Sequence, residues 1–129
     1  MHKILFVDDE APVRRAFEFL HGDFFEIEVA ESADQALKRV ASDQQIAIVV
    51  TDLKMPDKGG EELTRELRAQ FPKKKIVINT ANIDMQHLKK AINDASVDAF
   101  LEKVDHNPEA IQNVRSILAR LLQEYRDNE

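Results

Sequence analysis

Four short apolar runs, each followed at once by polar residues, constrain the fold of this chain more than any other feature. The runs are residues 4–7, 46–50, 76–78 and 99–101, and they lead into Asp8-Asp9, Thr51-Asp52, Asn79-Thr80 and Glu102-Lys103. Longer stretches with helical spacing of apolar residues separate them. This alternation is typical of parallel strands that helices bury on both faces. Because parallel strands point one way, their carboxyl ends share one edge, where open α/β sheets bind ligands.

Helix signals and one further strand complete the pattern. Apolar residues recur at helical spacing within residues 12–20, 36–40, 63–71, 85–94 and 111–125. Ser32 and Gln35 predict a capping box, and Asn107-Pro108 predicts a cap followed by Pro at the first helical position. Residues 25–29 alternate with a period of two, which predicts a strand toward the sheet edge. We therefore expect one domain over residues 1–129, a doubly wound α/β fold with five parallel strands and five helices.

Composition excludes several classes of function. The 129 residues include no Cys, so there is no disulfide framework, thiolate metal site or Cys nucleophile, which suits a cytoplasmic protein. The net charge of −6, with Lys73-Lys74-Lys75 as the only basic cluster, argues against direct binding to nucleic acid. No apolar run approaches the roughly 20 residues of a membrane span. A signal peptide is not expected either, because the first apolar run breaks at once into acidic residues.

The polar residues at the strand ends suit phosphoryl chemistry. Asp52 should end the central strand, and a carboxylate can attack phosphorus to form an acyl phosphate. Asp8 and Asp9 offer carboxylates to Mg²⁺, with Mn²⁺ as a second possibility. The Thr80 hydroxyl and the Lys103 ammonium can pair with phosphoryl oxygens. Each group alone has an ordinary alternative, such as a helix cap or a solvated charge, but together, at four strand ends, they favour a functional site.

In this order and at this spacing, the residues resemble a response regulator receiver domain of two-component signalling. The resemblance covers nearly the full length. The matching pieces are Asp8-Asp9, Thr51 to Pro56 around Asp52, Gly60, Thr80-Ala81 and Phe100 to Lys103. It implies a flavodoxin-like strand order, 2-1-3-4-5. It also implies a signalling domain rather than a turnover enzyme, phosphorylated with Mg²⁺ by a histidine kinase or phosphotransfer protein.

The resemblance further implies a role for each metal-site residue. Asp52 would be the phosphoacceptor and, with Asp9, a direct metal ligand, whereas Asp8 would bind the metal through water. The backbone carbonyl of Lys54 would complete the protein ligands. Two rival functions remain: a phosphorylation-independent protein-interaction module, and a phosphohydrolase with an Asp nucleophile. The second usually needs a carboxylate two residues after the nucleophile, where this chain has Lys54.

Near the phosphoryl group, the resemblance implies a switch pair, in which Thr80 moves toward the phosphate and Phe100 rotates inward behind it. Lys103 would contact the phosphoryl oxygens. Val104 stands where the family usually has Pro, and we expect a trans peptide bond there because cis bonds before other residues cost about 2.5–4 kcal/mol. Lys58 and Gly59 depart from the family pattern before Gly60, which removes a side-chain cap from the next helix.

The last helix suggests an assembly surface. Its apolar stripe is wider than the roughly 100° that docking on a sheet requires, so part of it could form an exposed patch. We therefore hypothesise a weak homodimer through the face made by the fourth helix, fifth strand and fifth helix. Residues 123–129 are polar and are either a tail or the start of a linker. The downstream effector is not identified by the sequence. The stripe consists of Ala110, Ile111, Val114, Ile117, Leu118, Leu121, Leu122 and Tyr125.

Overall fold

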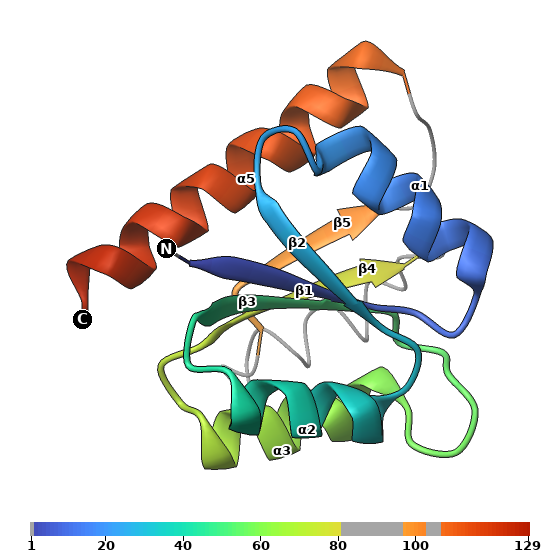
Figure 1. The fold of residues 1–129 in the computed structure, drawn as a ribbon, viewed down its shortest axis with the longest axis vertical. Helices are drawn as coiled ribbons and strands as arrows, with labels where there is room; N and C mark the ends of the chain where they lie inside the picture. Colours follow the sequence, from blue (N-terminus) through green and yellow to red (C-terminus); the bar gives the residue numbers. More distant parts are fainter. Residues whose placement is uncertain (1, 81–96, 103–106) are drawn as a thin grey trace.

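A five-stranded parallel sheet forms the centre of the molecule, in the order β2-β1-β3-β4-β5 (Figure 1). The computed structural model describes residues 2–80, 97–102 and 107–129. The predicted strand order is confirmed, and the strand with alternating residues lies at the sheet edge. The strands are β1 (Lys3–Val7), β2 (Glu26–Ala30), β3 (Ile46–Thr51), β4 (Lys75–Thr80) and β5 (Ala99–Glu102).

Helices cover both faces of this sheet. Helices α1 (Ala11–His21) and α5 (Pro108–Asp127) lie on one face, and α2 (Ala33–Ser42) and α3 (Gly60–Gln70) lie on the other (Figure 1). Four of the five predicted helices are therefore observed. The helix predicted over residues 85–94 and the peptide bond before Val104 lie outside the described residues.

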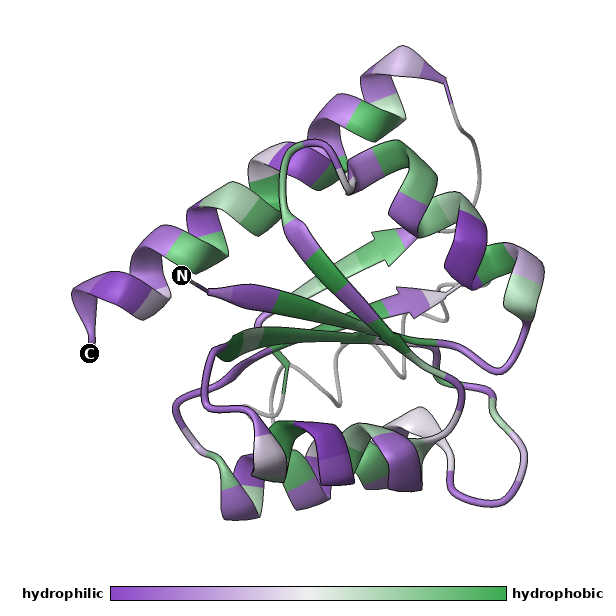
Figure 2. Ribbon diagram, viewed as in Figure 1, coloured by the Kyte–Doolittle hydropathy of each residue, from purple (hydrophilic) through white to green (hydrophobic). Residues whose placement is uncertain are grey.

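The core consists of two apolar layers, one on each side of the sheet. Alternate residues of a strand face opposite sides; in β1, for example, Phe6 packs toward α1 and α5 while Leu5 packs toward α2 and α3. The Phe6 ring stacks on Phe17 of α1, with ring centroids 4.0 Å apart. Central strand β3 is buried along its whole length. Figure 2 shows these hydrophobic strands between helices that are polar on their outer faces.

Side chains cap two helices as the sequence predicts. The Ser32 hydroxyl accepts the Gln35 amide hydrogen at 3.1 Å, and the Asn107 side chain accepts that of Ala110 at 2.8 Å. The Gln35 side chain accepts from the Glu31 amide at 2.7 Å, one residue earlier than the capping box requires. Each such cap is worth about 1 kcal/mol, so local sequence fixes where α2 and α5 begin.

The apolar stripe of α5 is partly buried. Leu118, Leu121 and Leu122 are buried, and the other five stripe residues are half-buried. Among the described residues, the exposed large hydrophobic side chains belong to α1 and the turn that follows it, not to α5. None of these exposed side chains belongs to the stripe, so the structure does not show the exposed patch expected on α5. The homodimer stays a prediction, and α5 also includes residues 123–127 of the polar C-terminal segment.

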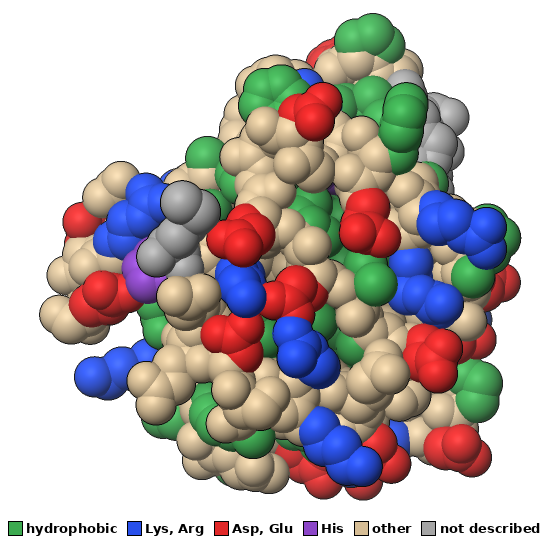
Figure 3. All heavy atoms as spheres, viewed as in Figure 1, with side chains coloured by type: hydrophobic (Ala, Val, Ile, Leu, Met, Phe, Trp, Pro, Cys, Tyr) green, Lys and Arg blue, Asp and Glu red, His purple; other side chains and the backbone are tan. Residues whose placement is uncertain are grey.

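Charges of both signs are interspersed on the molecular face shown in Figure 3. Near the amino end of β1, Lys3 pairs with Glu28 at 2.7 Å and with Asp43 at 2.9 Å, and Arg39 also pairs with Glu28. These contacts join β1, β2 and the end of α2.

Within the described part of the chain, no helix has the length and apolar character needed to cross a membrane.

Candidate functional site

The carboxyl ends of β1 and β3 are held side by side. The amide of Asp52, just after β3, donates to the Val7 carbonyl at 3.2 Å. The amide of Asp8, just after β1, donates to the Ala30 carbonyl at the end of β2 at 3.1 Å. These bonds extend the strand pairing by one residue, so both aspartates leave the sheet at the same edge.

Three carboxylates gather at this edge, as the sequence predicts. Asp8 is buried, Asp52 is half-buried and Asp9 is exposed, and one oxygen from each lies within 4.8 Å of the others. The Glu10 amide donates to Asp8 at 3.0 Å, and the Lys54 amide donates to Asp52 at 3.3 Å. Both contacts fix the direction of a carboxylate, so the cluster is preorganised by its own backbone.

The donor set fits a divalent cation. Like charges this close repel each other, and a bound cation removes the repulsion. Carboxylate oxygens are the ligands that Mg²⁺ prefers, and two carboxylates plus water and phosphate usually suffice. Asp8, Asp9 and Asp52 provide these oxygens at one end of the sheet, beside a surface open to solvent at Asp9.

The start of α3 packs directly on the backbone that carries Asp52. A Cβ atom at Gly60 would lie 2.8 Å from Leu53 Cα and closer still to the Asp52 carbonyl oxygen. The Gly60 amide donates to the Leu53 carbonyl at 3.0 Å. Helix α3 has Gly59 at its N-cap without a side-chain cap, as predicted. Space, rather than an unusual backbone angle, requires Gly60, because no described glycine has a positive φ.

Thr80 and Phe100 lie on β4 and β5, the two strands that follow β3 in the sheet order. Thr80 ends β4, the neighbour of β3, and its side chain is buried. Phe100 is half-buried and pairs with Ile78, while Glu102 pairs with Thr80. The structure therefore puts Thr80 at the same edge as the three aspartates. Lys103, the next residue after β5, lies outside the described residues.

A comparison with protein families matches residues 4–115 to the response regulator receiver domain. That range includes the acidic cluster and all five strands apart from Lys3, the first residue of β1. The chain belongs to this family. It is the receiver domain of a two-component response regulator. Receiver domains are generally signalling domains that interact with histidine kinases or phosphotransfer proteins.

Similar proteins agree with this assignment. The transcriptional regulatory protein FixJ of Rhizobium meliloti is 36% identical over 101 residues, which cover 75% of this chain and 47% of FixJ. The uncharacterized transcriptional regulatory protein YhcZ of Bacillus subtilis is 30% identical over 117 residues, which cover 89% of this chain and 54% of YhcZ. This receiver thus spans about half the length of the curated relatives it matches.

Solved structures show the same fold. A response regulator receiver domain protein from Clostridium thermocellum superposes with a TM-score of 0.88 at 24% identity, covering 100% of both chains. The response regulator TrrA from Thermotoga maritima, crystallised in complex with Mg²⁺ and BeF, has a TM-score of 0.74 at 29% identity and covers 91% of this chain and 99% of TrrA.

Two basic residues near the receiver's acidic site were not predicted from the sequence. The Arg14 guanidinium, on α1, donates to the Asp8 backbone carbonyl at 2.8 Å and so fastens α1 to the acidic loop. The Lys58 ammonium, in the loop after Asp52, contacts Glu66 at 2.7 Å and Asp34 at 3.2 Å. These two carboxylates raise the pKa of Lys58 above its ordinary value. No motif predicts these contacts, because the partners come from other elements of the fold.

Proposed function

We propose that Asp52 accepts a phosphoryl group from a phosphohistidine of a histidine kinase or phosphotransfer protein, and that this switches partner binding. The observation that carries the proposal is the meeting of three carboxylates within 4.8 Å, next to the strand that ends in Thr80. A cytoplasmic location follows from the same proposal, because the kinase domains that supply phosphohistidine use cytoplasmic ATP.

The reaction needs a nucleophile but no general base. A carboxylate oxygen of Asp52 forms a bond to phosphorus as the phosphorus–nitrogen bond of the phosphohistidine breaks. The bonding electrons leave with the imidazole nitrogen, which takes a proton from water. Because the Lys54 amide holds one oxygen of Asp52, the carboxylate is oriented before the donor arrives, which lowers the entropic part of the barrier.

Asp8, Asp9, Asp52 and the backbone carbonyl of Lys54 would hold Mg²⁺, or Mn²⁺ in its place. The bound cation supplies positive charge that neutralises the carboxylates and the phosphoryl oxygens. Asp8 is the buried member of the cluster, and the Glu10 amide fixes its direction. Asp9 is exposed, and it is therefore the carboxylate through which the ion can exchange with solvent.

Thr80, Phe100 and Lys103 would convert phosphorylation into a change of surface. The Thr80 hydroxyl would donate to a phosphoryl oxygen, and the Lys103 ammonium would contact another. Thr80 would then vacate space that the Phe100 ring can occupy. The pairing of β4 with β5 supports the switch pair, because Thr80 and Phe100 belong to adjacent strands. A partner that binds the surface around Phe100 would thus distinguish the phosphorylated protein from the unphosphorylated one.

Replacement of the acceptor tests the proposal. With acetyl phosphate and Mg²⁺, intact-protein mass spectrometry should show one added phosphoryl group on the wild type and none on Asp52→Asn. Asp57→Asn is the matched control, because Asp57 is an exposed carboxylate in the following loop with φ 65°, a conformation that Asn tolerates. Asp57→Asn should label normally. Phosphate on Asp8 or Asp9 of the wild type would contradict the assigned roles.

The same preparations separate the two rival functions. A phosphohydrolase would release phosphate from acetyl phosphate continuously, whereas a receiver retains one acyl phosphate per chain. An interaction module independent of phosphorylation would bind its partner with equal affinity in the presence and absence of beryllofluoride. We expect the affinity to change, and Asp52→Asn to abolish the change.

A further inference from the structure

We propose that the space between α1 and α5 is a binding site for a small, uncharged aromatic molecule that carries a carboxamide or a similar donor–acceptor pair. The site is a cavity of about 280 Å³ on the face of the sheet that α1 and α5 cover. It is separate from the acidic cluster, and none of its lining residues takes part in the phosphoryl chemistry proposed above.

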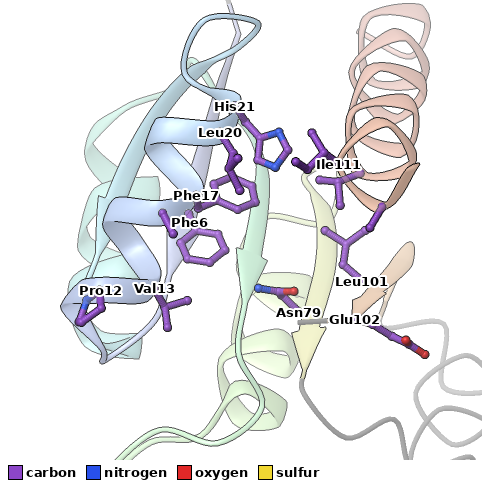
Figure 4. A pocket seen from close by; sticks show the side chains of 13 residues that line it. Phe6, Pro12, Val13, Phe17, Leu20, His21, Asn79, Leu101, Glu102 and Ile111 are labelled. Carbon is purple, nitrogen blue, oxygen red and sulfur yellow. The ribbon is translucent and has the colours of Figure 1, made fainter. Parts of the chain in front are cut away.

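The walls of the cavity are apolar and partly aromatic. Phe6 of β1 and Phe17 of α1 form one side, and Leu101 of β5 with Ile111 of α5 forms the other (Figure 4). Val114 of α5 also lines the cavity. An apolar cavity of about 150 Å³ can bind benzene. Twice that volume admits a ring with a substituent or a fused pair of rings.

Two buried polar side chains, His21 of α1 and Asn79 of β4, line this apolar space. Asn79, the penultimate residue of β4, is 8% exposed and lines the cavity. Figure 4 shows its carboxamide between Phe6 and Leu101, pointing into the space. The described residues make no hydrogen bond with this side chain. A buried amide without a partner costs free energy, so its place at the cavity floor indicates a ligand or water that completes its bonding.

The chemistry of the site selects the ligand class. A carboxamide offers two N–H donors and one carbonyl acceptor, and a second carboxamide pairs with both kinds of group at once. Glu102 lines the rim and is exposed, so its carboxylate disfavours an anionic ligand. The ring stack of Phe6 and Phe17 favours an aromatic body over an aliphatic one.

Titration of ¹⁵N-labelled protein with benzamide, followed by NMR, tests the proposal. We expect saturable shifts of the Asn79 side-chain amide and of backbone amides in α1 and α5, with a dissociation constant of the order of 1 mM for so small a ligand. Benzoate should bind at least tenfold more weakly. Non-saturable shifts, or equal binding of benzoate, would overturn the proposal and leave water as the partner of Asn79.

Two variants localise the binding. Asn79→Leu removes the carboxamide but keeps the volume, so benzamide affinity should fall at least tenfold while toluene still binds. Ala16→Leu, which fills the cavity from α1, should abolish binding of both probes; Ala41→Leu, at an exposed position of α2, is its matched control. Unchanged benzamide affinity in Asn79→Leu would refute the proposed role of Asn79 even if Ala16→Leu did not fold.

Discussion

Gly60 shows how one residue ties the third helix to the phosphoacceptor. Its α-carbon faces the peptide between Asp52 and Leu53 with no room for a methyl group, and the obstructing atoms are backbone atoms that cannot rotate away. Gly59, one residue earlier, is less restricted, because a Cβ there would lie 3.2 Å from the Leu53 carbonyl oxygen. The two adjacent glycines therefore provide a graded comparison.

We predict that Gly60→Ala destabilises the fold by about 1–3 kcal/mol, the usual cost of overpacking a filled site. It should also slow phosphorylation, because relief of the clash displaces the backbone of Asp52. Urea unfolding and the rate of labelling by acetyl phosphate measure the two effects. Gly59→Ala should lose less stability and should be phosphorylated at a rate closer to that of the wild type. Equal stability of the two variants would mean that the loop moves freely at no cost.

Among the elements, the start of β1 is joined to β2 and α2 by charged side chains. Lys3 contacts both Glu28 and Asp43. The Lys3 ammonium and the Gln45 amide, which both donate to Asp43, hold the pKa of its carboxyl below its ordinary value. A carboxyl whose pKa is lowered by folding stabilises the protein above its unfolded-state pKa, and this contribution disappears as the pH falls through the folded-state value.

Lys3→Met should therefore raise the pKa of Asp43 and destabilise the protein at neutral pH. The difference in unfolding free energy from the wild type should shrink as the pH falls below about 4, because Asp43 of the variant takes up its proton at a higher pH than Asp43 of the wild type. NMR titration of the Asp43 carboxyl and urea unfolding at several pH values measure these changes. Lys38→Met, at an exposed position of α2, is the matched control and should leave the Asp43 titration unaltered. A constant difference at all pH values would show that Lys3 acts by packing alone.

At the scale of the whole molecule, the sequence best predicts the positions of the strands, because the pattern of buried residues along the chain determines them. Strands β4 and β5 contain the apolar runs 76–78 and 99–101 and end within two residues of them, because a parallel strand is covered on both faces and polar residues follow where that cover ends. The meeting of the three aspartates could be predicted for the same reason, because each of them follows an apolar run. The exposure of the α5 stripe could not be predicted, because it depends on how the other elements of the fold pack around the helix.

Contacts made by long side chains, and spaces left between helices, could not be predicted. Arg14 reaches the Asp8 carbonyl, and Lys58 reaches α2 and α3, through flexible stems whose partners are set by tertiary structure. In the sequence, Asn79 is an ordinary polar residue near the end of a strand. Only the structure shows that it lines a cavity between α1 and α5. Shape between elements has no signature in a single sequence, so the cavity emerges only from the structure.

Because Asp8, Asp9 and Asp52 lie so close together, the melting temperature of the protein should depend on whether an ion is bound there. An ion that binds the folded chain alone stabilises it by about 2.7 kcal/mol at a hundred times its dissociation constant, which corresponds to roughly 10 °C for a domain of this size. Melting should thus rise with Mg²⁺ at constant ionic strength and fall with EDTA. In EDTA, Asp9→Asn should melt above the wild type, since one repelling charge is gone, and Mg²⁺ should shift it less. Identical melting of the wild type in Mg²⁺ and EDTA would mean that the folded chain binds no ion at this edge at the concentration used.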